Sequence, residues 1–433
     1  MNRQVRYLVQ PGERVGGELT VPGDKSISHR ALMLGGIADG RTEIHGFLPS
    51  EDCLATLAAL QAMGVTVDRT EPTRVCVHGA GVRGLSAPGQ VLDVGNSGTA
   101  MRLFMGLLAG QAFDTTLTGD ASLMTRPMER VARPLREMGA AIETHDGRPP
   151  VRITGGRRLH AIDYDLPVPS AQVKSAILLA GLQAAGTTRV TEPAPTRDHT
   201  ERMLQGFGVR VQRDGATVAI EGGQRLTATR VDVPADISSA AFFIVAGCLA
   251  AHEGLLLRSV GMNPTRTGVI DILRLMGADI SVEGARVSGG EPSADLRIKA
   301  APLRGVAIPE ALVPLAIDEF PVLFIAAAAA EGVTELRGAG ELRVKETDRL
   351  AVMAEGLGRL GVVHELLPDG IRIEGGPMSG GTVDSHGDHR IAMAFAVASL
   401  RASGPLEILD VANVATSFPG FVPLARAAGL LIT

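Results

Sequence analysis

The sequence predicts an α/β fold of two similar domains, each containing three copies of one repeating unit. Six alanine-rich apolar segments, spaced by about 70 residues, begin at a small or acidic polar residue: Ser26, Ser97, Ser170, Asp236, Asp318 and Asp388. Roughly 40 residues after each start, a second segment ends in a glycine: Gly64, Gly139, Gly208, Gly277, Gly361 and Gly429. At 433 residues the chain is also too long for one ordinary hydrophobic core.

The repeat assigns two helices and several strands to each unit. The six glycines are the expected C-terminal caps of the second helices, each leading into a strand. Before the first unit, a strand pair is expected around residues 5–9 and 17–21. We expect residues 22–236 to form the first domain, and residues 1–21 plus 237–433 to form the second. The chain would then cross between the domains twice, and paired crossings of this kind suit a hinge.

Composition narrows the class of protein and its compartment. A net charge of −5 gives no general reason to expect nucleic acid or an anionic membrane as a partner. The three cysteines have no close pairing or metal-site spacing, so we expect no disulfide and a reducing compartment. The N-terminus lacks a signal-peptide core, and the apolar runs at 240–251 and 320–330 are too short for a membrane span. We therefore expect a cytoplasmic protein.

The stretch from Gly95 to Arg102 illustrates how the start of a repeating unit could bind a ligand. Asn96 or Ser97 can cap the following helix, and glycine lets an anionic group approach its free backbone N–H groups. The alternative is an ordinary capped core helix. Because the chain repeats this arrangement six times, a binding role gains support.

Basic and polar residues accompany the starts of the first three units. Lys25, Ser26 and Arg30 suit a phosphate, although two solvated charges beside a turn are the alternative. Arg126 stands immediately before Pro127, which is expected to begin a helix. In the third unit, hydroxyl, amide and guanidinium groups together suit a polyhydroxylated anion: Ser170, Gln172 and Arg197.

The second set of three units carries the carboxylates. Asp318 opens an apolar helix where an acid could be held ready for proton transfer, although capping is its alternative role. Lys345 and Arg349 would share one helix face at i and i+4, where like charges repel unless an anion lies between them.

The segment from residue 384 to residue 390 is the remaining candidate. His389 could transfer a proton and Arg390 could bind a carboxylate or phosphate. A metal site is the weaker alternative, because no further Cys/His cluster supplies ligands at zinc-like spacing. We expect no metal and no cofactor.

Taken together, these motifs resemble the 5-enolpyruvylshikimate-3-phosphate synthase family, in its divergent bacterial branch, over essentially the whole chain. The matching motifs are Lys25-Ser26-x-Ser28-x-Arg30, Gly95 to Arg102, Arg126-Pro127, Ser170-Ala171-Gln172, Arg343 to Arg349 and Asp388-His389-Arg390. The resemblance implies two domains of three βαβαββ units, each about a pseudo-threefold axis, that close on a cleft. It also implies the reaction: the carboxyvinyl group of phosphoenolpyruvate passes to the 5-hydroxyl of shikimate 3-phosphate, releasing phosphate, on the shikimate pathway to chorismate and the aromatic amino acids.

The resemblance implies a role for each matching residue. Asp318 is the proton acceptor, Glu346 handles the methyl proton, and His389 supports them. Lys25 contacts both substrates. The implied shikimate 3-phosphate site comprises Lys25, Ser26, Arg30, Ser170, Ala171, Gln172, Arg197, Asp318 and Lys345. The implied phosphoenolpyruvate site comprises Lys25, Gly98, Arg126, Gln172, Arg349 and Arg390. The resemblance further implies a monomer.

Some positions depart from the family pattern. Glu341 and Thr416 stand where many members have an asparagine and a lysine, so neither is assigned to the site. In this family glyphosate occupies the phosphoenolpyruvate site, and a methyl group at the position of Gly98 is associated with tolerance. We expect such a methyl group to hinder glyphosate more than the shorter phosphoenolpyruvate.

Two alternatives remain. UDP-N-acetylglucosamine enolpyruvyl transferase is similar in fold and reaction, but that family has a cysteine at the position of Ala121 and an asparagine at that of Ser26. A non-catalytic repeat scaffold that binds partners on a concave face is the other. Such a scaffold would not need basic residues and carboxylates at the unit starts.

Overall fold

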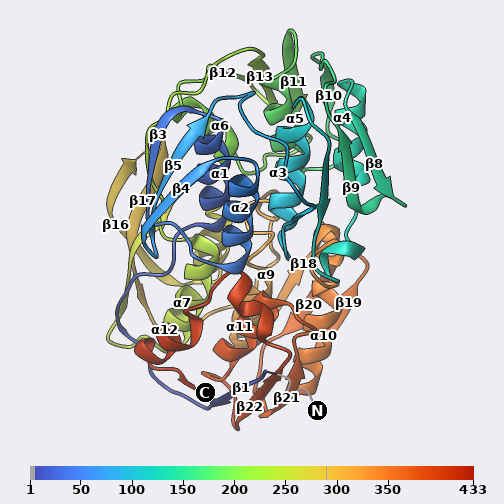
Figure 1. The fold of residues 1–433 in the computed structure, drawn as a ribbon. Coiled ribbons are helices and arrows are strands. Elements are labelled where there is room, and N and C mark those ends of the chain that lie inside the picture. The colour runs from blue at the N-terminus through green and yellow to red at the C-terminus, as the bar shows by residue number, and fades with distance from the viewer. Residues whose placement is uncertain (1–4, 289) are drawn as a thin grey trace. The chain divides into compact units, whose positions relative to one another are not determined.

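The computed structural model describes residues 5–288 and 290–433, and these divide into two compact units (Figure 1). Unit 1 comprises Met1–Pro22, Pro234–Arg286 and Pro292–Thr433. Unit 2 comprises Gly23–Val233 and Val287–Glu291. Each unit has its own hydrophobic core of buried residues. Within the described ranges, no helix is long and apolar enough to cross a membrane.

Unit 2 contains three four-stranded sheets, in the orders β14-β3-β5-β4, β6-β7-β9-β8 and β10-β11-β13-β12. In each sheet the first two strands pair in parallel and the remaining pairs are antiparallel. The strands are β3 (Asp39–His45), β4 (Thr66–Glu71), β5 (Arg74–Ala80), β6 (Leu92–Asp93), β7 (Thr115–Thr118), β8 (Ala141–His145), β9 (Arg148–Thr154), β10 (Asp163–Asp165), β11 (Thr187–Thr191), β12 (Val211–Asp214), β13 (Thr217–Glu221) and β14 (Arg230–Asp232). The helices are α1 (Lys25–Gly36), α2 (Glu51–Ala62), α3 (Gly98–Leu108), the short 3-10 helix η1 (Leu123–Thr125), α4 (Glu129–Glu137), α5 (Ala171–Gly181) and α6 (His199–Gly206).

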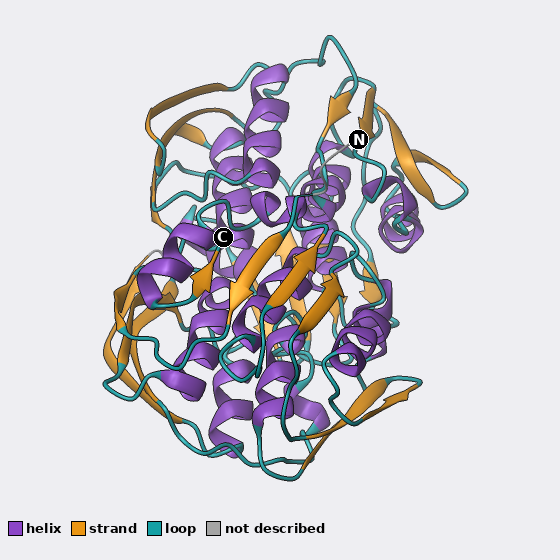
Figure 2. Cartoon of the chain, turned by 90° about the horizontal axis from the view of Figure 1, so that it is seen from below, coloured by secondary structure: helices purple, strands orange, loops and turns teal. Residues whose placement is uncertain are grey.

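Unit 1 contains the sheets β16-β17-β15-β2, β18-β20-β19 and β21-β22-β1-β23, and Figure 2 shows the last of these near the C-terminus. Its strands are β1 (Tyr7–Gln10), β2 (Gly17–Leu19), β15 (Leu255–Gly261), β16 (Asp279–Ser288), β17 (Glu291–Lys299), β18 (Val333–Leu336), β19 (His364–Leu367), β20 (Gly370–Glu374), β21 (Gly381–Asp384), β22 (Leu406–Leu409) and β23 (Leu431–Ile432). Its helices are α7 (Ile237–Ala250), α8 (Gly268–Leu275), η2 (Glu310–Leu312), α9 (Phe320–Ala329), η3 (Gly340–Val344), α10 (Arg349–Arg359), α11 (His389–Ala398), η4 (Ala412–Thr416) and α12 (Phe421–Ala428).

The last strand before each crossing belongs to a sheet of the unit that precedes the crossing. β2 pairs in parallel with β15 of unit 1, and β14 pairs in parallel with β3 of unit 2. β1 lies between β22 and β23. Residues 287–291, at the end of the β16–β17 hairpin, group with unit 2, although the sequence analysis assigned them to the second domain. Whether the crossings act as a hinge stays a prediction.

Each of the six sequence repeats contributes one nearly fully buried helix, which begins at or near the predicted helix start. These helices are α1, α3, α5, α7, α9 and α11. Side chains cap five of them by accepting a backbone N–H of the first turn: Asp24, Ser97, Ser170, Asp236 and Asp388. Helix α1 therefore begins at Lys25 and is capped by Asp24 rather than by Ser26. The side chain of Glu319 makes no cap hydrogen bond at α9, which has a proline in its first turn instead.

The predicted ends of the second helices are confirmed. The six glycines that follow them all have a positive φ, between 78° and 112°. This left-handed backbone favours glycine, because a Cβ would be strained there. Glycine also permits one close helix contact, since a Cβ on Gly106 of α3 would lie 2.1 Å from the carbonyl oxygen of Ala176 in α5.

Candidate active site

Arg30, on α1, is buried inside unit 2, where three hydrogen bonds hold its guanidinium. Its Nε donates to the Thr200 hydroxyl at 2.7 Å and its Nη2 to the Ser175 hydroxyl at 3.1 Å. Its Nη1 donates to the backbone oxygen of Ser26 at 2.9 Å. Burial lowers the pKa of Arg30 to about 10, so the guanidinium stays charged at neutral pH. Its neighbours therefore fix a buried cation in place beside Ser26.

Lys25 is the first residue of α1 and pairs with a carboxylate of the neighbouring helix. Its ammonium lies 2.9 Å from the carboxylate of Asp52, which is 5% exposed. The Lys25 side chain itself is 18% exposed. The lysine thus has a structural partner in addition to any ligand, which the sequence analysis did not foresee.

The starts of α3 and α5 are joined through the amide of Gln172. Its Nε2 donates to the Thr99 hydroxyl at 3.0 Å, and its Oε1 accepts from Arg102 Nη1 at 2.6 Å. Ser170 caps α5, which begins at Ala171. Two residues of α3 therefore orient this amide of α5.

Arg126 is positioned by side chains, not by a helix. The prediction that Pro127 begins a helix is wrong, because α4 begins at Glu129 and Arg126 follows the 3-10 turn η1. Its Nη2 donates to Asn96 Oδ1 at 2.6 Å and to the Ser122 hydroxyl at 3.2 Å. Arg197 lies, half-buried, in the loop before α6.

Gly98 faces two of these guanidinium groups. A Cβ built on this residue would lie 3.0 Å from Arg102 Nη1 and 3.2 Å from Arg126 Nη1. An alanine methyl would therefore press on both arginines before it reached open space. Whether such a methyl group hinders glyphosate more than phosphoenolpyruvate stays a prediction.

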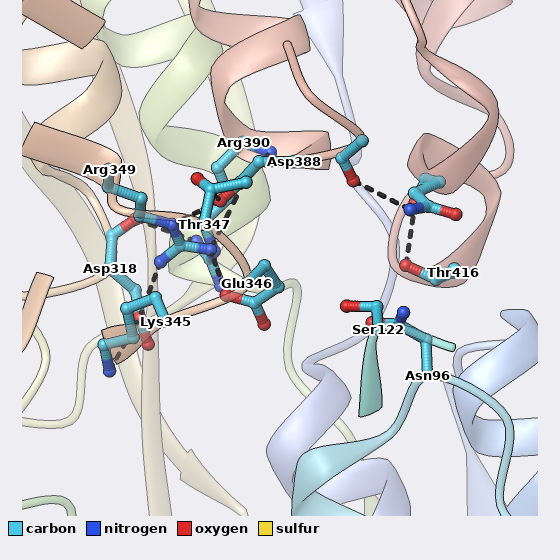
Figure 3. A network of polar contacts seen from close by, with 12 residues as sticks. Asn96, Ser122, Asp318, Lys345, Glu346, Thr347, Arg349, Asp388, Arg390 and Thr416 are labelled. Carbon is cyan, nitrogen blue, oxygen red and sulfur yellow. Dashed lines mark hydrogen bonds and ion pairs between the residues drawn. The ribbon is translucent and has the colours of Figure 1, made fainter. Parts of the chain in front are cut away.

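In unit 1, the buried guanidinium of Arg349 gathers three carboxylates (Figure 3). Its Nε lies 2.8 Å from Asp388 Oδ2, and its Nη2 lies 2.6 Å from Glu346 Oε2. Its Nη1 lies 3.3 Å from Asp318 Oδ1. Burial opposes the charge, but the three carboxylates outweigh burial and raise the pKa of Arg349 above its usual value.

Asp318 links this network to a second cation. Its Oδ1 lies 3.5 Å from Lys345 Nζ as well as 3.3 Å from Arg349. The prediction that Lys345 and Arg349 share a helix face is wrong, because α10 begins only at Arg349. The Asp318 carboxylate of the chain itself lies within ion-pair distance of both cations, and an anionic ligand between them stays a prediction.

Helix α11 contributes the last of the predicted residues. Asp388 caps it by accepting the backbone N–H of Arg390 at 2.9 Å. The Arg390 Nη1 donates to the backbone oxygen of Asp318 at 3.1 Å. His389 is buried at the start of the same helix. Thr416 donates to the backbone oxygen of Asn413 within η4, so its hydroxyl is used locally.

The structure thus gathers the predicted residues into two sets, one in each unit. Sequence reasoning missed several side chains that orient them: Asp52, Asn96, Arg102, Ser175, Thr200 and Asp388 as a partner of Arg349. Asn96 and Arg102 stand inside the Gly95 to Arg102 motif, so the sequence could have indicated their role. The side-chain partners of Lys25 and Arg30 lie 27 or more residues away along the chain, and motif spacing does not predict such contacts.

Comparisons with known proteins all point to one family. A family model described as EPSP synthase (3-phosphoshikimate 1-carboxyvinyltransferase) matches residues 9–424. The 3-phosphoshikimate 1-carboxyvinyltransferase of Alkalilimnicola ehrlichii is 64% identical over 431 residues, covering 99% of this chain and 97% of that protein. That of Halorhodospira halophila is 65% identical over 426 residues, covering 98% and 96%. The EPSP synthase structure from Acinetobacter baumannii has a TM-score of 0.89 and 55% identity, covering 99% of both chains.

The repeated unit and these likenesses define an α/β enzyme with the enolpyruvyl transferase fold. The chain belongs to the EPSP synthase family. It is therefore a carboxyvinyl transferase of the shikimate pathway, which serves aromatic amino acid biosynthesis. The UDP-N-acetylglucosamine enolpyruvyl transferase alternative is not favoured.

The Arg349 network yields a stability prediction. Arg349→Met should lower the free energy of unfolding by about 3–5 kcal/mol, because Asp388 is 0% exposed and loses its cation. Arg359→Met is the matched control on the same helix. Arg359 is 53% exposed and pairs with Glu355, so its loss should cost about 1 kcal/mol or less. Urea unfolding of both variants measures the difference, and equal losses would contradict the network's structural role.

A second prediction concerns pH and His29 of α1. Complete burial, together with Lys25 and Arg30, lowers the pKa of His29 well below 6.5. The folded protein keeps this ring neutral, whereas the unfolded chain binds a proton there below pH 6.5. Stability contributed by the neutral ring is therefore lost as the pH falls below 6.5, by up to about 1.4 kcal/mol per pH unit.

Urea unfolding at about pH 7.5 and about pH 5.5 tests this. His29→Gln should lose less stability between the two values than the wild type does. His145→Gln, which alters an exposed side chain, is the control and should behave as the wild type. If His29→Gln retains the full acid sensitivity, His29 is not its source.

Proposed function

We propose that the two residue sets bind shikimate 3-phosphate and phosphoenolpyruvate and carry out the family's addition and elimination. In the addition, the 5-hydroxyl of shikimate 3-phosphate bonds to C2 of phosphoenolpyruvate while C3 gains a proton. In the elimination, C3 loses a proton, the double bond re-forms and phosphate leaves. The observation that carries the proposal is that neighbouring groups fix the head groups of basic side chains spread along the chain, from Lys25 to Arg390. Three of these cations stand at helix starts: Lys25, Arg349 and Arg390.

Shikimate 3-phosphate is assigned mainly to unit 2. Arg30 and Lys25 provide fixed positive charge beside Ser26, which suits a phosphate. The hydroxyl of Ser170, the start of α5 at Ala171 and the oriented amide of Gln172 suit the hydroxyl groups of the ring. Arg197, with Asp318 and Lys345 of unit 1, completes the proposed set.

Phosphoenolpyruvate is assigned to arginines of both units. Arg126 is fixed by Asn96, and Gly98 leaves the space beside its guanidinium open for an anion. Lys25 and Gln172 would serve this substrate too. In unit 1, Arg349 and Arg390 supply the remaining positive charge.

Asp318 and Glu346 are the proposed groups for proton transfer. Both carboxylates contact Arg349, which orients them without filling every oxygen lone pair. Following the family pattern, Asp318 accepts the proton of the 5-hydroxyl and Glu346 exchanges the methyl proton at C3. His389 supports them from the start of α11. Acids and bases suffice for an addition and elimination of this kind, so the proposal includes no cofactor.

The cellular setting is also proposed from the sequence. Three unpaired cysteines suit a reducing compartment, and we infer a cytoplasmic location. We propose that the enzyme acts as a monomer, with neither nucleic acid nor a membrane as a partner.

Phosphate release tests the activity. Purified protein given phosphoenolpyruvate and shikimate 3-phosphate should release phosphate, whereas phosphoenolpyruvate with UDP-N-acetylglucosamine should not. Absence of release with the first pair would overturn the proposed substrates. Lys25→Met should abolish most of this release, because its ammonium would contact both anions.

The contact between Lys25 and Asp52 calls for a paired control. Lys25→Met alone should also lower the melting temperature, since the buried carboxylate of Asp52 loses a cation. Adding Asp52→Asn should restore much of that stability while activity stays lost. Recovery of activity together with stability in the double variant would assign Lys25 a purely structural role.

A further inference from the structure

Three side chains that the proposed reaction does not use meet on one face of the β3–β5–β4 sheet in unit 2. Cys76 and His78 lie two residues apart in β5, so their side chains point to the same face. Asp68 of β4 pairs directly with Cys76 across the two strands. Val75 and Val77, which alternate with Cys76 and His78 along β5, point to the opposite face and are buried in the core. The three polar side chains therefore lie on the solvent-facing side.

The ligand atoms of these residues are close together. His78 Nε2 lies 2.8 Å from Asp68 Oδ2 and 3.8 Å from Cys76 Sγ. All three atoms lie within 4.8 Å of one another. Tetrahedral zinc, with bonds of about 2.0–2.3 Å, places its ligand atoms about 3.4–3.6 Å apart. To reach that spacing, the distance between His78 and Asp68 would lengthen by about 0.6 Å and the distance between His78 and Cys76 would shorten by about 0.2–0.4 Å.

We propose that Asp68, Cys76 and His78 bind a zinc ion through one carboxylate, one thiolate and one imidazole. Thiolate and imidazole ligands favour zinc over magnesium or calcium, which prefer oxygen. Three protein ligands leave the fourth tetrahedral position to water. Because Asp68 is on β4, at the edge of the sheet, the ion would tie the edge strand to β5.

Arg41 of β3 limits the affinity of this site. Its Nε donates to Cys76 Sγ at 2.8 Å. A bound metal would take this sulfur lone pair, so the guanidinium must turn away. It is free to do so, because the Arg41 side chain is 62% exposed and lies 3.4 Å from the alternative partner Glu43.

Spacing along the chain does not predict this site, and no metal was expected from it. Asp68 and Cys76 are brought together by strand register instead. None of the three residues belongs to the proposed active site, so the zinc site and the transferase activity can be tested separately.

Cobalt(II) is the probe, because a tetrahedral cobalt thiolate site has a charge-transfer band in the near ultraviolet and intense visible bands. Titration of metal-free, full-length protein should produce these bands with one ion per chain, and added zinc should abolish them. Cys76→Ser should remove the charge-transfer band. His78→Ala and Asp68→Ala should each weaken binding by about tenfold or more.

Cys248→Ser is the control, since that cysteine is buried in unit 1 and should leave the bands unchanged. Phosphate release by Cys76→Ser should equal that of the wild type, which also shows that the variant is folded. An absent charge-transfer band in the wild type would overturn the proposal. Equal bands in wild type and Cys76→Ser, or unchanged affinity in His78→Ala, would overturn it as well.

Discussion

The need to satisfy the first backbone N–H groups of buried helices shapes both the fold and the site. Six helices run through the cores of the two units, and their N-termini have donors without intrahelical partners. Side chains such as Ser97 and Asp388 meet this need by capping. The same positions favour anions, because the helix dipole is positive there.

Electrostatic pairing then fixes the charged side chains that these starts bring together. In unit 1, Arg349 is fully buried and tolerates burial only because Asp318, Glu346 and Asp388 surround it. In unit 2, Arg30 is held by hydroxyl groups rather than by carboxylates in direct contact. The two environments suit different work. We propose that hydroxyl-bound Arg30 binds a phosphate and that two of the carboxylates around Arg349 transfer protons.

The helix starts and ends that recur in each repeat could be predicted from the sequence. Contacts that depend on strand register or on residues distant in the chain could not. Capping residues and the positive-φ glycines recur at fixed spacing, so the helix starts at Ser97 and Ser170 and the helix end at Gly64 could be predicted. The prediction of one helix containing both Lys345 and Arg349 is wrong, because Asp348 caps α10 and the helix begins only at Arg349. The contact of Lys25 with Asp52, and the meeting of Asp68 with Cys76, could not be predicted because tertiary packing and strand pairing create them.

Calorimetric titration tests most directly whether the fixed cations of unit 2 recognise shikimate 3-phosphate. Wild-type protein should bind one shikimate 3-phosphate per chain and should show no binding of UDP-N-acetylglucosamine. Arg30→Gln, checked for an intact fold by its melting transition, should bind shikimate 3-phosphate about tenfold more weakly or worse, because a charge-assisted contact is lost. Unchanged affinity in folded Arg30→Gln would show that this cation does not bind shikimate 3-phosphate, and binding of UDP-N-acetylglucosamine by the wild type would contradict the proposed substrate.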